Sequence, residues 1–123
     1  MRTTQHASRA FHDLLAESPH GRFAIVSSKQ AQAPSGTNAA YAATKAAAES
    51  WTMAMADSFR EAGSAATANV LVVNAIVTPA MREQSPEKAF KTFTSTEQIA
   101  EGLAFLCSEA GAKMNGQRLS LHG

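Results

Sequence analysis

Tyr41 and Lys45 are the residues of this chain best suited to acid–base chemistry. They stand four residues apart, a spacing that puts both side chains on one face of a helix. A free phenol loses its proton only near pH ~10, but a neighbouring ammonium group stabilises the phenolate. Ser27-Ser28 ends an apolar segment upstream, so a strand end can bring a hydroxyl to the pair. These groups predict a site that moves a proton on or off an alcohol or carbonyl oxygen.

A tyrosine and a lysine at this spacing are also typical of ordinary pairs on a helix surface. The order of the elements around them favours the catalytic interpretation. An apolar strand ends in Ser-Ser, a loop with Pro34 and Gly36 follows, and a helix then opens with Tyr41 and Lys45. Each part alone is a weak signal, and their succession is the stronger one.

Two helices and a strand must position these residues. Helical spacing of apolar residues predicts a helix over about 3–17, and residues 23–26 form a short apolar run typical of a buried strand. A second helix is predicted over about 39–62, capped by Thr37 or Asn38 and ended by Gly63. The apolar stripe expected on it consists of Ala48, Trp51, Met55 and Phe59.

The second half of the chain continues the alternation. A buried strand is predicted over 68–76, an irregular segment over 77–93 with a short helical turn at Ser85-Pro86-Glu87, and a last strand over 117–121. Thr94 to Glu97 reads as a capping box that opens a helix of about 96–109. Its expected buried face consists of Ile99, Leu103, Leu106 and Cys107.

The resulting order αβαβαβ predicts an α/β fold with about three parallel strands joined by right-handed helical crossovers. With 123 residues, the chain is expected to form a single domain, 1–123. Apolar residues make up 45% and charged residues 17%, as in a soluble globular protein, and the net charge of +1 argues against nucleic acid as a partner.

Localisation and metal binding are predicted from a few residue types. A single cysteine favours a reducing, cytoplasmic setting, and neither a signal peptide nor a membrane span is expected. Cys107 is predicted to be a buried structural thiol. The four histidines share no ligand spacing, so no metal site is expected.

The motifs together resemble the C-terminal half of a short-chain dehydrogenase/reductase. Residues 23–28 are similar to the strand of that family that ends in its catalytic serine, and residues 41–47 to its active-site helix. Residues 73–81 resemble the strand and loop that border the nicotinamide, and residues 115–119 the last strand with its lead-in. The likeness covers nearly the whole chain and implies a partial Rossmann-like, three-layer fold.

The resemblance implies a role for each matching residue. Tyr41 would be the general acid in carbonyl reduction and the general base in alcohol oxidation. Lys45 would favour the ionised phenol and hold the nicotinamide ribose, and Ser28 would orient the substrate oxygen. Thr78 would contact the cofactor, NAD or NADP, together with Tyr41 and Lys45. A flexible lid over 80–93 would bring Met81, Phe90 and Phe93 to the substrate.

The chain departs from the family pattern at three points. No set of its glycines fits the glycine-rich phosphate turn, so the N-terminal dinucleotide-binding half is expected to be absent. The family's catalytic asparagine would fall just before Met1. The segment Ile76-Val77-Thr78-Pro79 lacks the Pro-Gly that usually follows the strand.

These departures leave three functions open. The chain is an oxidoreductase segment that is active when completed by an N-terminal partner or in a longer native product, an inactive interaction or oligomerisation module, or a truncated product without activity. The strand over 23–27 would lie at a sheet edge without its usual neighbour, which predicts a weakly stable protein or an obligate homo-oligomer. Hydride transfer by the chain alone is expected to be feeble or nil.

Overall fold

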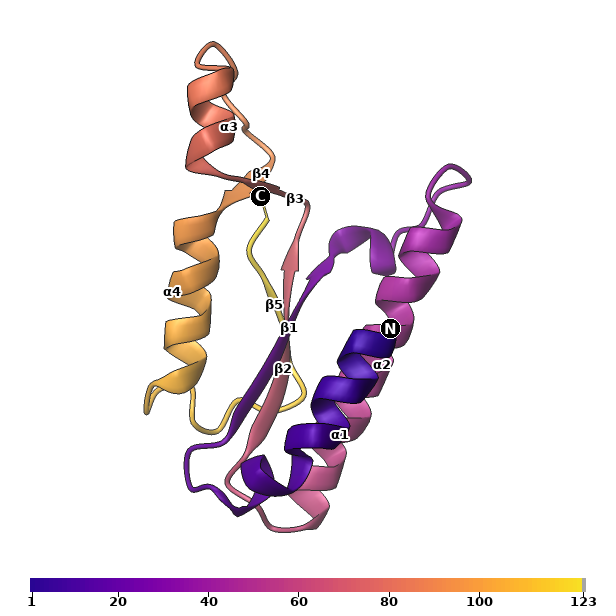
Figure 1. Ribbon diagram of the computed structural model, residues 1–123, viewed down its shortest axis with the longest axis vertical. Helices are drawn as coiled ribbons and strands as arrows, with labels where there is room; N and C mark the ends of the chain where they lie inside the picture. Colours follow the sequence, from indigo (N-terminus) through magenta and orange to yellow (C-terminus); the bar gives the residue numbers. More distant parts are fainter. Residues whose placement is uncertain (123) are drawn as a thin grey trace.

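The computed structural model describes residues 1–122 as helices and parallel strands in alternation (Figure 1). In chain order the elements are α1 (Arg2–Glu17), β1 (Arg22–Ser28), the 3₁₀ helix η1 (Lys29–Ala31), α2 (Ala39–Glu61), β2 (Thr67–Val73), β3 (Ala75–Val77), α3 (Pro79–Gln84), β4 (Phe93–Ser95), α4 (Thr96–Cys107) and β5 (Arg118–Ser120). The main sheet has the order β1-β2-β5, and β3 pairs with β4 in a separate two-stranded sheet. All pairings are parallel. Helices α1 and α2 lie side by side on one face of the main sheet and α4 lies on the other (Figure 1), which confirms the predicted α/β class with parallel strands flanked by helices.

Strand β2 is the centre of the molecule because its seven residues are all buried. It pairs with β1 along its whole length, from Arg22 opposite Thr67 to Ser28 opposite Val73. The carboxyl ends of the two strands therefore lie at the same level. Among the described strands β1 pairs only with β2, so the prediction that it is an edge strand is confirmed.

The second half of α2 is fixed to the sheet by apolar packing. Met55, Ala56 and Phe59 form a buried cluster with Ala66 and Ala68 at the start of β2. Full burial of one large apolar side chain contributes roughly 1.5–3 kcal/mol. This half of the helix is therefore the firm base from which the first half, with Tyr41 and Lys45, extends.

The ends of α2 agree with the predicted boundaries. Asn38 occupies the N-cap position, but its side chain accepts a hydrogen bond from Ser35 N (2.7 Å) and makes no cap bond to the helix. Gly63 follows the helix with φ of 67°, a left-handed conformation that glycine adopts without the steric cost of a Cβ.

The segment after β2 was predicted incorrectly in two respects. The expected strand over 68–76 is two strands, and the second, β3, pairs with β4 instead of extending the main sheet. The segment over 77–93, predicted to be irregular, contains the short helix α3, which begins at Pro79. The helical turn expected at Ser85-Pro86-Glu87 is present after it, closed by Lys88 N, which donates to Ser85 O (3.0 Å). Thr78 accepts a hydrogen bond from Met81 N (3.2 Å) and Pro79 occupies the first helical turn, so a capping hydroxyl followed by proline determines this helix start.

Helix α4 requires two corrections. Its capping box joins Ser95 and Gln98 rather than Thr94 and Glu97, because Thr94 belongs to β4 and donates its hydroxyl to Leu121 O (2.6 Å). The expected burial of Cys107 is wrong, since the thiol is exposed, and on the predicted buried face only Leu106 is fully buried. Helical periodicity identifies an apolar face, but it does not show how much of that face a three-stranded sheet can cover.

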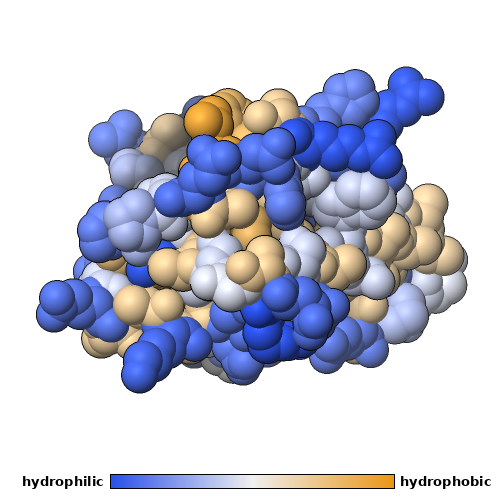
Figure 2. Space-filling model, turned by 90° about the horizontal axis from the view of Figure 1, so that it is seen from below, coloured by the Kyte–Doolittle hydropathy of each residue, from blue (hydrophilic) through white to orange (hydrophobic). Residues whose placement is uncertain are grey.

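The two ends of the sheet differ in character. The amino end, seen from below in Figure 2, carries hydrophilic side chains at its rim with less polar residues between them. The carboxyl end carries η1, the start of α2 and the β3–β4 pair (Figure 1). No helix within residues 1–122 combines the length and apolar character needed to cross a bilayer.

Candidate active site

A groove of about 320 Å³ opens at the carboxyl end of the main sheet. It is lined by residues from the ends of β1 and β2, from the start of α2 and from β3: Val26, Ser27, Tyr41, Lys45, Val73, Asn74, Ala75 and Ile76. Open parallel α/β sheets bind their ligands in crevices outside the carboxyl ends of the strands. This groove is therefore the place in the fold where a small molecule is expected.

Tyr41 and Lys45 border the groove from adjacent turns of α2. Lys45 Nζ lies 5.9 Å from the centroid of the Tyr41 ring, as their spacing in the sequence predicts. The same ammonium donates a hydrogen bond to Val26 O (3.3 Å), which ties it to the end of β1. Because an ammonium has three protons, two more remain available for other acceptors. Tyr41 is 50% exposed, so its phenol is open to a ligand in the groove.

The two serines at the end of β1 have different surroundings. Ser27 lines the groove, and its buried hydroxyl donates to Glu49 Oε2 (2.5 Å). Ser28, the predicted catalytic serine, is also buried and is not among the residues that line the groove. Its oxygen accepts a hydrogen bond from Gln30 N (3.2 Å) and caps η1, while its own proton remains free to be donated. The catalytic role of Ser28 stays a prediction.

The other predicted binding residues do not line this groove. Thr78 follows β3 and uses its hydroxyl to cap α3. Met81 lies on α3, while Phe90 and Phe93 contact each other edge-to-face with ring centroids 5.2 Å apart. Phe90 has a φ of 51°, an uncommon left-handed conformation for a bulky residue, so the backbone of the predicted lid is strained there.

Two residues of the groove belong to the segment expected to border the nicotinamide, but neither was predicted individually as a site residue. Asn74, between β2 and β3, lines the groove and donates its amide to Thr92 O (3.2 Å), which links it to the segment before β4. Ile76 lines the groove from β3 with an exposed apolar side chain. A polar residue directly after the apolar run of residues 70–73 was the available signal for Asn74, since such a residue stands at the carboxyl end of the sheet.

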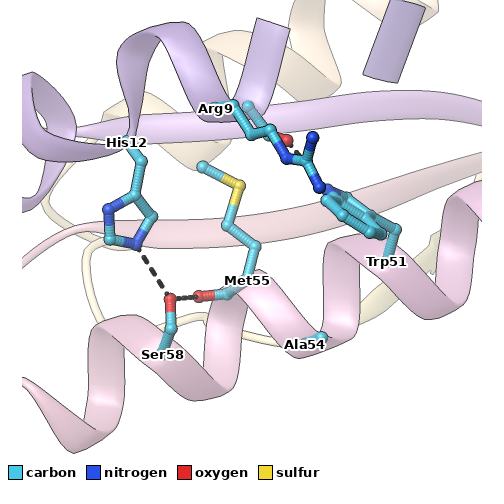
Figure 3. Close-up of a pocket in the computed structure, with 7 residues that line it drawn as sticks. Arg9, His12, Trp51, Ala54, Met55 and Ser58 are labelled. Carbon is cyan, nitrogen blue, oxygen red and sulfur yellow. Dashed lines mark hydrogen bonds between the residues drawn. The ribbon is translucent and has the colours of Figure 1, made fainter. Parts of the chain in front are cut away.

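A second hollow, of about 240 Å³, lies between α1 and α2 (Figure 3). The guanidinium of Arg9 lies over the ring of Trp51, 5.4 Å from its centroid, and Trp51 Nε1 donates to Ser8 Oγ (2.8 Å). His12 Nε2 lies 3.1 Å from Ser58 Oγ. These contacts hold the two helices together.

His12 also approaches the carboxylate of Asp13, so that Asp13, His12 and Ser58 form a succession like that of a hydrolytic triad. A nucleophilic serine must donate its proton to the histidine. Ser58 instead donates its proton to Met55 O (2.8 Å), and the side chain of Asp13 is 95% exposed. The arrangement is therefore a structural link and not a nucleophilic site. Within residues 1–122, histidine, cysteine and carboxylate groups form no cluster of three that would hold a metal ion.

Comparison with known proteins identifies what the chain is similar to. The family model described as short chain dehydrogenase matches residues 1–89. The short chain dehydrogenase penD of Penicillium thymicola is 35% identical over 117 residues, which cover 84% of this chain and 42% of that protein.

Solved structures give the same result. A short chain dehydrogenase/reductase family protein superposes with a TM-score of 0.80 at 25% identity and covers 98% of this chain and 52% of its own. A short chain dehydrogenase from Burkholderia cenocepacia, solved in complex with NADP, gives a TM-score of 0.77 at 25% identity over 98% of this chain and 51% of its own. The chain thus spans about half the length of the relatives that it matches.

Proposed function

The chain belongs to the short chain dehydrogenase family, and from this premise we propose that it forms the C-terminal, substrate-side half of an oxidoreductase that moves a hydride between a nicotinamide cofactor and a carbonyl or alcohol. The observation that carries the proposal is the groove in which Tyr41 and Lys45 lie together at the carboxyl end of the sheet. The chain's length, about half that of its relatives, supports the assignment of residues 1–123 to one half of the family fold.

The residues of the groove fit the nicotinamide end of such a cofactor. Lys45 has ammonium protons to donate to sugar hydroxyls, and the groove offers both apolar walls, from Val73 and Ile76, and polar groups. The chain carries no glycine-rich turn that would hold the pyrophosphate. The Burkholderia relative was solved in complex with NADP, which supports NAD or NADP as the cofactor.

When bound, the cofactor supplies or accepts the hydride. Tyr41 donates its phenol proton to the substrate oxygen in carbonyl reduction and takes it back in alcohol oxidation. Lys45 holds positive charge beside the phenol and stabilises the phenolate that proton donation leaves. Ser28, whose hydroxyl proton is free, orients the substrate oxygen by donating to it. Thr78 contacts the cofactor, and Met81, Phe90 and Phe93 approach the substrate when the segment 80–93 closes.

The proposal includes a requirement for the other half of the fold, supplied by a partner or by a longer product to which this chain belongs. Strand β1 is an edge with partly exposed apolar residues, and Phe11 and Leu14 on α1 are 56% and 67% exposed. Both features favour a partner, either a polypeptide that supplies the missing half or a second copy of the chain. The exposed, unpaired Cys107 supports a reducing, cytoplasmic setting.

The test is a reductase assay that follows oxidation of NADH or NADPH with a panel of aldehydes and ketones. The chain is measured alone and together with the part of the Burkholderia enzyme that it does not cover. We expect activity only in the second case, and Tyr41→Phe should lower it by about 10²-fold or more. Thr44→Ala is the matched control, because Thr44 is exposed on the same helix and donates only to Ala40 O (2.9 Å).

Activity that survives Tyr41→Phe unchanged would contradict the proposed mechanism. Tight, saturable cofactor binding by the chain alone would contradict the requirement for completion.

The exposed apolar residues also favour a second candidate function, an interaction module without catalysis. In that case the chain would co-purify with an intact relative whether or not Tyr41 is replaced. Size-exclusion chromatography with light scattering tests the shared expectation, since a well-folded monodisperse monomer would argue against both forms of partnership.

A further inference from the structure

Glu49 is a buried carboxylate near the middle of α2, with only 6% of its surface exposed. A charge removed from water is costly unless it is paired and hydrogen-bonded. Both of its oxygens are engaged. Ser27 Oγ donates to Oε2 (2.5 Å), and Arg118 Nε donates to Oε1 (2.6 Å) with a longer contact from its second nitrogen to Oε2 (3.5 Å).

These partners lie on opposite edges of the main sheet. Ser27 belongs to β1 and Arg118 to β5, and β2 lies between the two strands. A single side chain of α2 is therefore bound to both edge strands across the central strand. Such a three-way link fixes where the helix lies over the sheet, and apolar packing alone sets that position less strictly because hydrophobic contact is non-directional.

The contacts of Glu49 lie next to those of Lys45 on both α2 and β1. Tyr41, Lys45 and Glu49 stand at intervals of four residues and so share one stripe of α2. Lys45 donates to the carbonyl of Val26 and Glu49 accepts from the hydroxyl of the next residue, Ser27. Two successive turns of the helix are thus bound to two successive residues of the strand.

Arg118 also affects Lys45. Glu49 and Lys45 are four residues apart, a spacing at which opposite charges attract each other on a helix. Among the described residues the salt bridge of Glu49 is with Arg118 and not with Lys45. The ammonium of Lys45 is therefore left for the groove.

We propose that Glu49 is a positioning residue that, through Ser27 and Arg118, holds α2 in the register at which Lys45 reaches Val26 and Tyr41 borders the groove. It does not touch substrate or cofactor. The proposal deepens the function proposed above and rests on it for its catalytic consequence, whereas the positioning itself is measurable on the chain alone.

The competing explanation is a buried ion pair that serves stability only. Removing one charge leaves the other buried without a partner and destabilises the protein. Replacing both with apolar residues of similar volume often leaves stability unchanged or raises it. The double variant Glu49→Leu/Arg118→Leu therefore separates the two explanations. It should recover the urea midpoint of the unchanged chain while losing the directional link to Ser27.

Tyr41 is the only tyrosine in the chain, so selective ring ¹³C labelling of tyrosine gives nuclear magnetic resonance signals from this residue alone. We expect these signals to shift or broaden in the double variant. They should change less in Glu49→Gln, which keeps the volume and one acceptor oxygen. Met55→Ala is the matched control, because it weakens the core on the same helix and leaves the polar stripe intact.

In the reductase assay, the double variant should lower kcat by about 10–100-fold with little change in KM, as expected when reacting groups are misplaced. Unchanged Tyr41 signals and an unchanged kcat in a double variant with the normal urea midpoint would overturn the proposal. If that variant does not fold, the same readings on Glu49→Gln decide, and Tyr41 signals identical to those of the unchanged chain would overturn it. Should the completed, unchanged chain show no reductase activity, the proposed function fails while the labelled tyrosine still reports on positioning.

Discussion

Helix α2 carries two series of residues at four-residue intervals, and the two series make different kinds of contact. The first, Tyr41, Lys45 and Glu49, meets the ends and edges of strands through polar contacts with a carbonyl, a hydroxyl and a guanidinium. The second, Trp51, Met55 and Phe59, packs against α1 and the start of β2. Exposure differs most between the outer ends of the two series, because Phe59 is 0% exposed and Tyr41 is 50% exposed, whereas Glu49 and Met55 are equally buried.

The difference indicates a division of labour within one helix. The second series buries apolar area and fixes the helix to the molecule, but such contacts tolerate small displacements. The first series buries little apolar area and instead makes directional bonds, which set orientation. Apolar packing fixes one half of the helix to the molecule, and directional hydrogen bonds orient the other half. Together they can hold an exposed phenol in place.

The largest effect expected from this comparison is on stability. Phe59→Ala removes a fully buried ring from the second series and should lower the free energy of unfolding by about 3–5 kcal/mol. Urea unfolding followed by circular dichroism measures this loss. Phe11→Ala is the control, because Phe11 is mostly exposed and its replacement should change stability by only about 0.5 kcal/mol. Equal losses in the two variants would mean that the second series is not the anchor.

An intermediate effect is expected where the second series makes its polar contact. Ser8→Ala removes the acceptor of the Trp51 indole N–H, which should cost about 1–3 kcal/mol because the donor is left unpaired. Trp51 is the only tryptophan, so its fluorescence reports the local change directly. Ser50→Ala, at an exposed neighbouring position, should leave both stability and emission unchanged. Emission that stays constant in Ser8→Ala would show that the contact does not hold the ring.

The comparison also explains which parts of the molecule the sequence could predict. The second series was recognisable because apolar residues at helical spacing signal a buried face. The stripe of Tyr41 and Lys45 was recognisable because local spacing determines it. The contacts of Glu49 were not, since they join residues 22 and 69 positions apart, and no local pattern encodes such a pairing.

Other errors have equally specific causes. Strands β3 and β4 have three residues each, too few for a periodic signal, and each exists because it pairs with the other. Cys107 lies on an apolar helix face, but whether a neighbour covers that face depends on tertiary packing. The 3₁₀ helix η1, which Ser28 caps, was also not predicted, because no local pattern in residues 29–31 signals it.

The smallest effect on stability is expected at Tyr41 itself, and it sharpens the comparison most. Tyr41→Phe removes a half-exposed hydroxyl, so the free energy of unfolding should change by no more than about 0.5 kcal/mol. The same substitution is expected to lower the proposed reductase activity of the completed enzyme by about 10²-fold or more, whereas Phe59→Ala should impair activity only as far as it unfolds the chain. Urea unfolding and the reductase assay on both variants provide the four measurements. If Tyr41→Phe proved as destabilising as Ser8→Ala, the phenol would be part of the anchor, and its loss could no longer be assigned to chemistry alone.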